Sequence, residues 1–248
     1  MNDDISDHPN LDQSGQHYII DKKLIKYIVD EAMLLPDDVV LEIGYGHGEL
    51  TKELARRCKV IAVDIVKADL VHKNITTVNG NILDIFPALF KKYGFNKIVS
   101  NIPYNISEPL MRQIFKVDIE SVLLTVGKNF SEILTKEDNR IGIIANKLYD
   151  IELLSVVKPK SFHPMPRTDS AIIMMRQKDA DTVPKASAIY KELVLLDDKK
   201  LKNCFEKILT IDKRKIKQLT TSEIFNKKLY ALTNKEFTEL DTFIEKLE

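Results

Sequence analysis

Blocks of apolar and polar residues alternate along the chain, and the spacing inside each block follows one of two periods. From Asp21 to Met33 apolar residues recur every three or four positions, which predicts a helix, and Val39–Ile43 is a short apolar run typical of a buried strand. Further strands are predicted over Lys59–Asp64, Ile75–Val78, Asn96–Ser100 and Ile119–Val126, with helices over Glu49–Arg57, Ile85–Lys92 and Ser107–Phe115. This order of strand and helix predicts a mostly parallel sheet with helices on both faces.

The pattern changes after Lys128. A helix is predicted over residues 139–149, and two β-rich stretches, Ile151–Val157 and Thr168–Arg176, flank a loop from Lys158 to Arg167. Because this loop is shorter than the dozen or more residues that a parallel crossover needs, the two stretches are expected to form an antiparallel pair. Beyond the last of them, every segment has helical spacing.

These patterns predict an α/β fold with three parts. Residues 1–14 are polar and acidic and are expected to be a disordered tail. Residues 15–180 are expected to form one domain with a mostly parallel sheet and an antiparallel last strand. Residues 181–248 are expected to form a small all-α domain.

The composition is that of a globular protein, with 248 residues, of which 44% are hydrophobic and 30% charged. No apolar run reaches the ~18–20 residues of a membrane span, and the acidic start is unlike a signal peptide. Cys58 and Cys204 match no metal or disulfide spacing, and the histidines form no ligand set. We therefore expect a cytoplasmic protein in a reducing environment, without metal and without a membrane partner.

Charge is balanced over the whole chain but not along it. The 37 basic and 37 acidic side chains cancel, yet residues 199–218 hold eight basic and two acidic side chains. Such a block is typical either of a solvated helix face or of contacts with phosphates, and composition leaves both interpretations open. The candidates for phosphate contact are Lys199, Lys200, Lys202, Lys213, Arg214, Lys215 and Lys217.

A glycine-rich segment follows the first predicted strand. Gly44 and Gly46 allow a tight turn and a close approach of backbone to ligand, although such a segment is also compatible with a plain turn. Asp64 ends the next strand, where its carboxylate can accept hydrogen bonds from ribose hydroxyls or can simply be solvated. The compact spacing, with Glu42 before it, favours S-adenosylmethionine over a dinucleotide, because no pyrophosphate has to be bound.

Asn101-Ile102-Pro103-Tyr104 follows the strand Asn96–Ser100. An exocyclic amine on a base is a poor nucleophile, because its lone pair is delocalised into the ring. The Asn101 side-chain oxygen can accept its N–H group and so direct the lone pair at a methyl group, while Pro103 stiffens the turn and Tyr104 stacks on the base. The alternative is an ordinary Asn-x-Pro turn.

Phe162 lies in the loop before the last predicted strand, among Pro159, Pro164 and Pro166. Two interpretations are open for it. It is either a second aromatic wall that holds an extruded base against Tyr104, or a core residue between loop prolines.

Ordered segments over residues 13–178 together resemble one family. They are Gly15–Asp21 (G-Q-N/H-F-L-x-D), Val39–Gly48 (V-L-E-I-G-x-G-x-G), Val63-Asp64 (V-E/D-x-D), Gly80–Leu83 (G-D-A-L), Asn101–Ser107 (N-L-P-Y-N-I-S) and Phe162–Ala171 (F-x-P-x-P-x-V-x-S-A). The chain resembles the small-subunit ribosomal RNA adenine dimethyltransferases of the kasugamycin-resistance type and their relatives that methylate 23S RNA. It is similar to an archaeal-like or diverged member.

The resemblance implies a Rossmann-like S-adenosylmethionine-dependent methyltransferase domain and a helical RNA-recognition domain. It implies two methyl transfers to N6 of each of two adjacent adenines near the 3′ end of small-subunit rRNA, by a monomer acting on the pre-ribosomal small subunit during ribosome biogenesis. The implied cofactor site is His17, Ile19, Gly44, Gly46, Asp64, Asn81 and Asn101, and the implied catalytic residues are Asn101, Pro103, Tyr104 and Phe162.

Two departures from the family pattern bear on function. Asn81 replaces an aspartate and lacks its negative charge, and Asp197-Asp198 stands in a segment that is usually rich in arginine. They leave open a catalytically weak or inactive relative that acts as a ribosome-assembly or transcription factor. A methyltransferase for a small-molecule or protein amide nitrogen is a further alternative.

Overall fold

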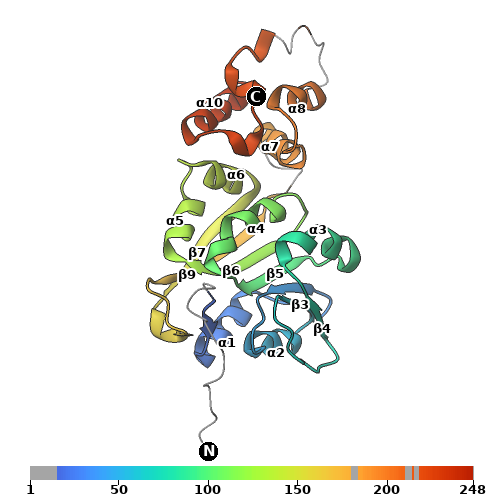
Figure 1. The fold of residues 1–248 in the computed structure, drawn as a ribbon, viewed down its shortest axis with the longest axis vertical. Helices are drawn as coiled ribbons and strands as arrows, with labels where there is room; N and C mark the ends of the chain where they lie inside the picture. The colour runs from blue at the N-terminus through green and yellow to red at the C-terminus, as the bar shows by residue number, and fades with distance from the viewer. Residues whose placement is uncertain (1–15, 180–183, 210–213, 215–217, 248) are drawn as a thin grey trace, which may run out of the picture. The chain divides into compact units, whose positions relative to one another are not determined.

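The computed structural model describes residues 16–179, 184–209, 214 and 218–247 (Figure 1). The expected tail and the expected domain boundary at residues 180 and 181 lie outside the described residues. The chain divides into two compact units. The first comprises Met1–Leu110, Ile119–Ser131 and Leu153–Met174, and the second comprises Met111–Asp118, Glu132–Glu152 and Met175–Glu248.

Seven strands form one sheet in the order β4-β3-β2-β5-β6-β9-β7. They are β2 (Val39–Ile43), β3 (Lys59–Asp64), β4 (Ile75–Asn79), β5 (Lys97–Asn101), β6 (Ser121–Gly127), β7 (Tyr149–Val157) and β9 (Ser170–Gln177). The pairs β2–β3, β3–β4, β2–β5 and β5–β6 are parallel. The mostly parallel sheet predicted from the sequence is therefore confirmed, with small shifts at the strand ends.

Strand β9 is antiparallel to both of its neighbours. The Lys128 N–H group, at the end of β6, donates to the carbonyl of Asp169, at the start of β9 (3.0 Å). The Lys178 N–H group, just after β9, donates to the carbonyl of Leu148, just before β7 (3.0 Å). The end of one strand thus meets the start of the next, which confirms the antiparallel pair expected around the loop from Lys158 to Arg167.

The α-helices are α1 (Lys22–Glu31), α2 (Glu49–Ala55), α3 (Ile82–Tyr93), α4 (Ser107–Ile114), α5 (Lys128–Thr135), α6 (Arg140–Leu148), α7 (Lys185–Leu195), α8 (Leu201–Ile208) and α10 (Asn234–Glu245). The sequence-based prediction missed α5, because it follows β6 without a turn signal. No described helix is both long enough and apolar enough to cross a membrane.

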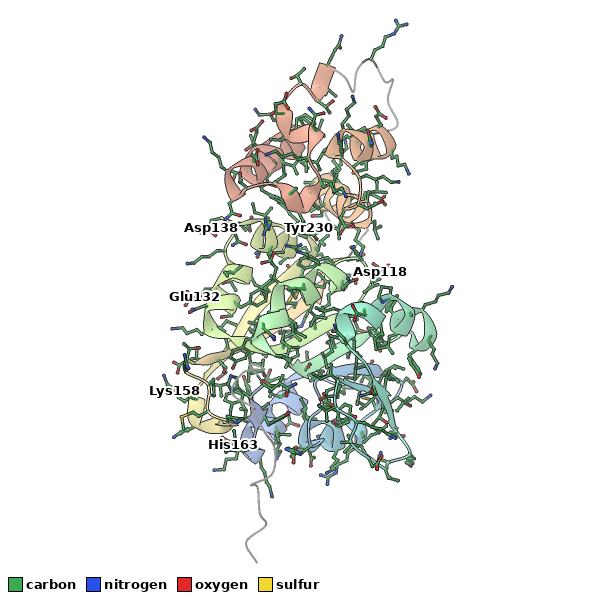
Figure 2. All side chains as sticks on the ribbon, in the orientation of Figure 1. Asp118, Glu132, Asp138, Lys158, His163 and Tyr230 are labelled. Atoms are coloured by element: carbon green, nitrogen blue, oxygen red, sulfur yellow. The ribbon has the colours of Figure 1, made fainter. Side chains whose placement is uncertain are left out.

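A small second sheet, which the sequence did not predict, pairs β1 (Tyr18–Ile19) with β8 (Phe162–His163). Tyr18 lies opposite His163, which Figure 2 labels in the yellow loop, and Ile19 lies opposite Phe162. The Ile20 N–H group also donates to the Ser161 carbonyl (2.9 Å). The segment before α1 is therefore held against the loop that joins β7 to β9.

Local sequence explains where helix α3 begins and ends. The Asn81 side chain caps its first turn by accepting from the Leu83 N–H group (3.1 Å). Gly94 ends it in the left-handed conformation, at φ 57°, which glycine adopts without steric cost. Between these residues Phe86 and Leu89 are buried, so the apolar face of the helix is the buried one.

The core of the first unit is built on the central strands. Val40, Leu41, Val60, Ala62 and Ile98 are fully buried although neighbouring residues of a strand point to opposite faces. The sheet is therefore covered on both sides, as its near-continuous apolar strands predict.

The helical part of the second unit has its own core. The rings of Phe205, Phe225 and Phe243 pack edge to face, with centroids 4.9–5.7 Å apart. The buried Tyr190 ring stacks on Phe237 and donates its hydroxyl to Asp241 (2.9 Å). These contacts join α7, α8 and α10, as the all-helical pattern at the end of the sequence predicts.

A buried ion pair holds the start of β5 in the first unit. The Lys97 ammonium lies 3.0 Å from the Asp38 carboxylate, and both side chains are about 95% buried. Burial alone raises the pKa of Asp38, but hydrogen bonds from Leu35, Asn96 and Lys97 outweigh it and bring the pKa below the ordinary 3.8. The pair therefore stabilises the fold above about pH 4, and its contribution is lost as the pH falls through the lowered pKa.

Removing one partner should be more harmful than removing both. We expect Lys97→Met to lower the free energy of unfolding by about 3–5 kcal/mol, because Asp38 is left buried without its counter-charge. The double variant Asp38→Asn with Lys97→Met, measured by the same urea titration at neutral pH, should lose less. Equal losses in the two variants would contradict this account of the pair.

Candidate functional site

The glycine segment between β2 and α2 is a tight turn whose form depends on glycine. Gly44, Gly46 and Gly48 all have positive φ angles, at 75°, 52° and 82°. A Cβ atom on Gly46 would lie 2.4 Å from Cε1 of Tyr18, so the segment is also packed under a tyrosine of β1. Position 46 thus needs both a positive φ and the absence of a Cβ atom, and only glycine satisfies both requirements.

Asp64, at the end of β3, is hydrogen-bonded to the turn. One carboxylate oxygen accepts from the Gly46 N–H group (3.0 Å) and the other from the Val66 N–H group (2.9 Å). The Tyr45 hydroxyl accepts from the Ala68 N–H group (3.0 Å) and so braces the segment that follows β3. Each carboxylate oxygen retains a lone pair, so Asp64 can accept further hydrogen bonds.

A cavity of about 320 Å³ opens beside this turn. It is lined by Gln16, Ile43, Gly44, Val63, Asp64, Ile65, Gly80, Asn81, Ile82, Pro103, Asn105 and Ile106. A narrow adjoining cavity is lined by Gln16, His17, Tyr18, Gly44, Asp64, Asn101, Ile102 and Pro103. The structure thus gathers six of the residues singled out in the sequence around the carboxyl ends of β2, β3 and β5, where ligands bind in open α/β sheets.

Asn101, the last residue of β5, has an oriented side chain. Its Nδ2 donates to the His17 carbonyl (2.6 Å), and the His17 ring contacts the Pro164 carbonyl through Nδ1 (2.8 Å). The buried Oδ1 of Asn101 has no hydrogen-bond partner among the described residues. A buried acceptor that is fixed and unsatisfied is suited to receive an N–H group from a ligand.

Tyr104 lies next to this acceptor in a short 3₁₀ turn, Tyr104–Ile106. Its hydroxyl is hydrogen-bonded to Oγ of Ser170, and its ring centroid lies 5.3 Å from that of His17. Burial raises the pKa of Tyr104, so its phenol is neutral at physiological pH. A Cβ atom on Gly127 would lie 3.4 Å from the ring, so Gly127 borders the Tyr104 ring.

Glu42 lies in the candidate site, although the sequence analysis assigned it no role there beyond its place before the glycine segment. It is 2% exposed in β2, lines a small cavity with Gly44 and Asn101, and has an oxygen without a partner among the described residues. Burial, with Asp64 and Glu49 nearby, raises the pKa of Glu42 to about 8. The sequence signal that could have pointed to Glu42 is that it is a lone acidic residue inside an otherwise apolar strand.

The structure places two predicted site residues in the core. Phe162 is 2% exposed and Ile19 is 7% exposed, and they pair across β1 and β8 within one apolar cluster. Phe162 is absent from the lining of all three cavities that Gly44 lines. This favours the core interpretation of Phe162, in which it supports the segment that carries His17.

The model of the family described as ribosomal RNA adenine dimethylase matches residues 8–242 of the chain. The chain belongs to this family. A relative from Methanopyrus kandleri, named a probable ribosomal RNA small subunit methyltransferase A, is 34% identical over 182 residues, which cover 68% of this chain and 65% of that protein. One of the same name from Methanococcus aeolicus is 29% identical over 248 residues, which cover 90% and 92%.

Two solved structures have the same fold as this dimethylase family member. A dimethyladenosine transferase from Plasmodium falciparum matches with a TM-score of 0.62 and 21% identity, over 90% of this chain and 96% of that one. The 23S rRNA methyltransferase ErmE matches with a TM-score of 0.58 and 22% identity, over 92% and 99%. The Rossmann-like methyltransferase fold is therefore confirmed, and with the family comes S-adenosylmethionine as cofactor.

The predicted phosphate-contact residues are only partly described. Lys213, Lys215 and Lys217 lie outside the described residues, while Lys200, Lys202 and Arg214 are exposed. Lys199 is half-buried and lies beside Lys207, whose pKa it lowers. One of the two acidic departures has a structural role, because Asp197 pairs with Lys116 (2.8 Å).

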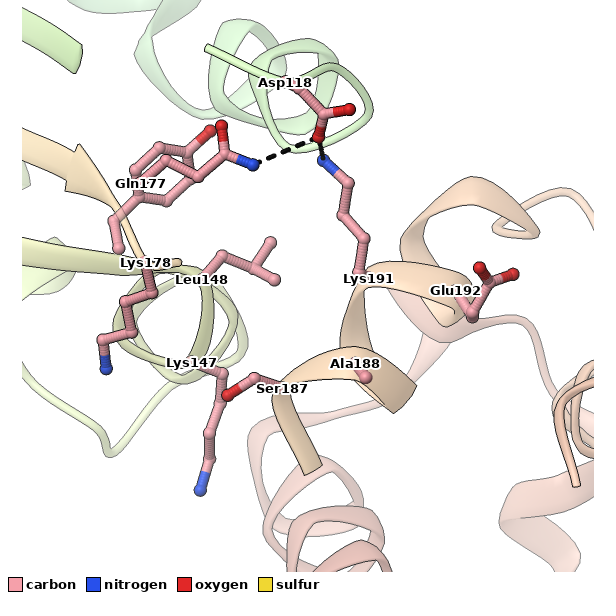
Figure 3. Close-up of a pocket in the computed structure, with 10 residues that line it drawn as sticks. Asp118, Lys147, Leu148, Gln177, Lys178, Ser187, Ala188, Lys191 and Glu192 are labelled. Atoms are coloured by element: carbon pink, nitrogen blue, oxygen red, sulfur yellow. Dashed lines mark hydrogen bonds and ion pairs between the residues drawn. The ribbon is translucent and has the colours of Figure 1, made fainter. Parts of the chain in front are cut away.

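A separate cavity, of about 230 Å³, lies within the second unit near the start of α7 (Figure 3). Asp118 projects toward it and is held by Lys191 (2.9 Å) and by the Gln177 amide (3.1 Å). The Lys147 ammonium pairs with Glu245 and Asp241 instead. Asp118 and Lys147 are thus both neutralised by ion pairs, and the described residues hold no cluster that could bind a metal ion there or elsewhere.

Gly46→Ala should weaken S-adenosylmethionine binding by about tenfold, or ~1.4 kcal/mol, because the added methyl group displaces Tyr18 from the turn. Gly94→Ala is a matched control. It also has positive φ, at 57°, but nothing lies within 4 Å of its Cβ, so both variants incur the same left-handed strain of about 1–2 kcal/mol. Calorimetric titration should show near-normal affinity for Gly94→Ala, and equal affinities would refute the role given to Tyr18 packing.

The raised pKa of Glu42 predicts how stability depends on pH. Between the ordinary value of 4.5 and about 8, the folded state keeps a proton that the unfolded state has lost, so stability should fall as the pH rises. Glu42→Gln should remove this fall, and the variant should be more stable than the parent at pH 8. Urea unfolding between pH 4.5 and 8 would measure the free energy of unfolding, with the surface variant Glu53→Gln as control. An unchanged dependence of stability on pH in Glu42→Gln would contradict the raised pKa of Glu42.

Proposed function

We propose that this S-adenosylmethionine-dependent ribosomal RNA adenine dimethyltransferase methylates N6 of two adjacent adenines near the 3′ end of small-subunit rRNA. The observation that carries the proposal is the buried, unsatisfied Oδ1 of Asn101, held in place by the His17 carbonyl beside the glycine turn. An acceptor in this position suits an exocyclic amine, which needs its N–H group bound before its lone pair can react.

The residues around the larger cavity fit the cofactor. A volume of about 320 Å³ is within the range of small-molecule sites, and its lining is mostly apolar with a few polar groups. Asp64 would accept from the ribose hydroxyls, Asn81 would lie at the adenine, and Gly44, Gly46 and the segment of His17 would border the methionine end. S-adenosylmethionine supplies an electrophilic methyl group when bound.

Asn81 fits this role although it departs from the family pattern. Its oxygen already accepts from the Leu83 N–H group as the cap of α3, a position that asparagine and aspartate fill equally well. A second lone pair on that oxygen remains for an adenine amino group. The substitution therefore removes a negative charge without removing the acceptor or the cap.

The target adenine would lie between the Asn101 acceptor and the Tyr104 ring. Asn101 Oδ1 accepts one N–H of the amine and turns its lone pair toward the methyl donor, while Tyr104 stacks on the base and remains neutral. Pro103 lies between Asn101 and Tyr104 in the chain, and its ring restricts the backbone of the turn that joins them. Methyl transfer would break the S–CH₃ bond and leave the cofactor as a neutral thioether, and the methylated amine, which is then acidic, would lose a proton to a nearby acceptor or to water.

The partner is the pre-ribosomal small subunit, which a cytoplasmic monomer would bind during ribosome biogenesis. Exposed Lys200, Lys202 and Arg214, in the sequence block that also includes Lys213, Lys215 and Lys217, support contact with rRNA phosphates. The decisive experiment is transfer of tritium from labelled S-adenosylmethionine to unmethylated small subunits, followed by mass mapping of the rRNA. Dimethylation of two adjacent adenines is expected. Absence of transfer at saturating cofactor would instead support an inactive assembly factor.

Asn101→Ala should lower kcat by about 100-fold, since it removes one preorganised polar group at the reacting atom. Affinity for S-adenosylmethionine should change much less. Tyr104→Phe, which keeps the ring and removes only the hydroxyl bound to Ser170, should lose far less activity. Single-turnover kinetics and calorimetric titration separate the two effects, and parallel losses of kcat and cofactor affinity in Asn101→Ala would make Asn101 a plain cofactor ligand.

A further inference from the structure

The loop of residues 158–167, between β7 and β9, is fixed at its base and exposed at its surface. Ser161, Phe162 and Pro166 are buried, and Phe162 is paired with Ile19 of β1. Met165, by contrast, is 64% exposed. The sequence left open whether Phe162 contacts a base or packs in the core, and the large apolar side chain that the loop exposes is Met165.

This loop is continuous with the proposed catalytic groups. The Pro164 carbonyl, one residue before Met165, contacts the His17 ring, and the His17 carbonyl holds Asn101. Ser170, shortly after the loop, is hydrogen-bonded to Tyr104. Met165 therefore lies in the chain between the two groups that position the acceptor and the stacking ring.

The same loop is basic in a chain without net charge. Lys158, Lys160 and Arg167 are exposed, and Asp169 neutralises one of them by pairing with Lys158 (2.8 Å). Figure 2 shows Lys158 and His163 projecting from this yellow segment. Ile20, whose N–H group is bonded to Ser161 of the loop, is 58% exposed. The loop and the adjoining start of α1 thus present apolar and basic side chains together.

A surface with this combination fits single-stranded RNA. Lysine and arginine pair with phosphates, and exposed methionine and isoleucine pack against bases or insert between base steps. Lysine is depleted at protein–protein interfaces, so the exposed Lys160 and Arg167 on either side of Met165 in the sequence favour a polyanion over a protein partner.

We infer that residues 158–167 hold the RNA nucleotides that flank the target adenine, with Met165 packed against a neighbouring base and with Lys160 and Arg167 at phosphates. This inference rests on the proposed function. It makes Met165 a positioning residue, because it keeps the neighbouring base in place while the target base is extruded toward Tyr104.

The test compares two pairs of variants in methylation of unmethylated small subunits. Met165→Ala should lower kcat/KM by about tenfold, mainly through KM, while Met165→Leu, which keeps an apolar side chain of similar size, should stay near the parent. Affinity for S-adenosylmethionine and the midpoint of thermal unfolding should be unchanged in both. A loss of either would indicate a structural role and overturn the inference.

The charge contribution is tested by binding to a short single-stranded RNA with two adjacent adenines. Lys160→Gln with Arg167→Gln should weaken binding and reduce the slope of log affinity against log salt by about 0.7 for each lost phosphate contact. Lys91→Gln with Lys92→Gln, at the far end of α3, removes the same charge and should leave the slope unchanged.

These outcomes separate the inference from the function on which it rests. If the parent enzyme methylates small subunits but neither loop variant changes KM or the salt slope, the inference is wrong and the function stands. If the parent transfers no methyl group, the proposed function fails, and the RNA-binding comparison still decides whether the loop contacts RNA.

Discussion

Parallel pairing of β2, β3 and β5 is the constraint on which the site depends. Their register sets Ile43 beside Val63, so that the turn after β2 and the carboxylate at the end of β3 meet at one edge of the sheet. Asn101 ends β5 at the same edge. Residues separated by dozens of positions in the chain become neighbours because parallel strands end on the same side, and no single loop has to supply the whole site.

The hydrogen bond from Asn101 to the His17 carbonyl extends this arrangement beyond the sheet. It engages Nδ2 of the Asn101 amide and leaves Oδ1 without a partner among the described residues. The side chain is thereby held in one orientation, with Oδ1 available as an acceptor. His17 is held in turn by β1, by its pairing with β8 and by the Pro164 carbonyl. The N-terminal segment and the loop between β7 and β9 are therefore parts of one support for a single oxygen atom.

Charge in this protein is organised locally, which the zero net charge hides. Lys97 and Asp38 are buried as a pair, Lys116 neutralises Asp197, and Lys191 neutralises Asp118. Other basic residues are exposed, among them those of the loop 158–167 and of the segment after Lys199. A local excess of exposed basic side chains creates an attractive field for a polyanionic substrate even where the net charge of the chain is zero.

The sequence by itself determined the order of the strands in the main sheet and of most helices, the antiparallel last strand and the residues at the strand ends. Hydrophobic period, glycine spacing and loop length are local properties, and each is visible along the chain. The motif around Asn101 likewise led to the proposal of Asn101 as the acceptor and of Tyr104 as the stacking ring. Only the tertiary structure showed that Phe162 is buried, which favours its core interpretation, because burial depends on what packs around a side chain. It also showed the raised pKa of Glu42, the pairing of β1 with β8 and the exposure of Met165. These depend on contacts between segments far apart in the chain, for which no period or motif provides a signal.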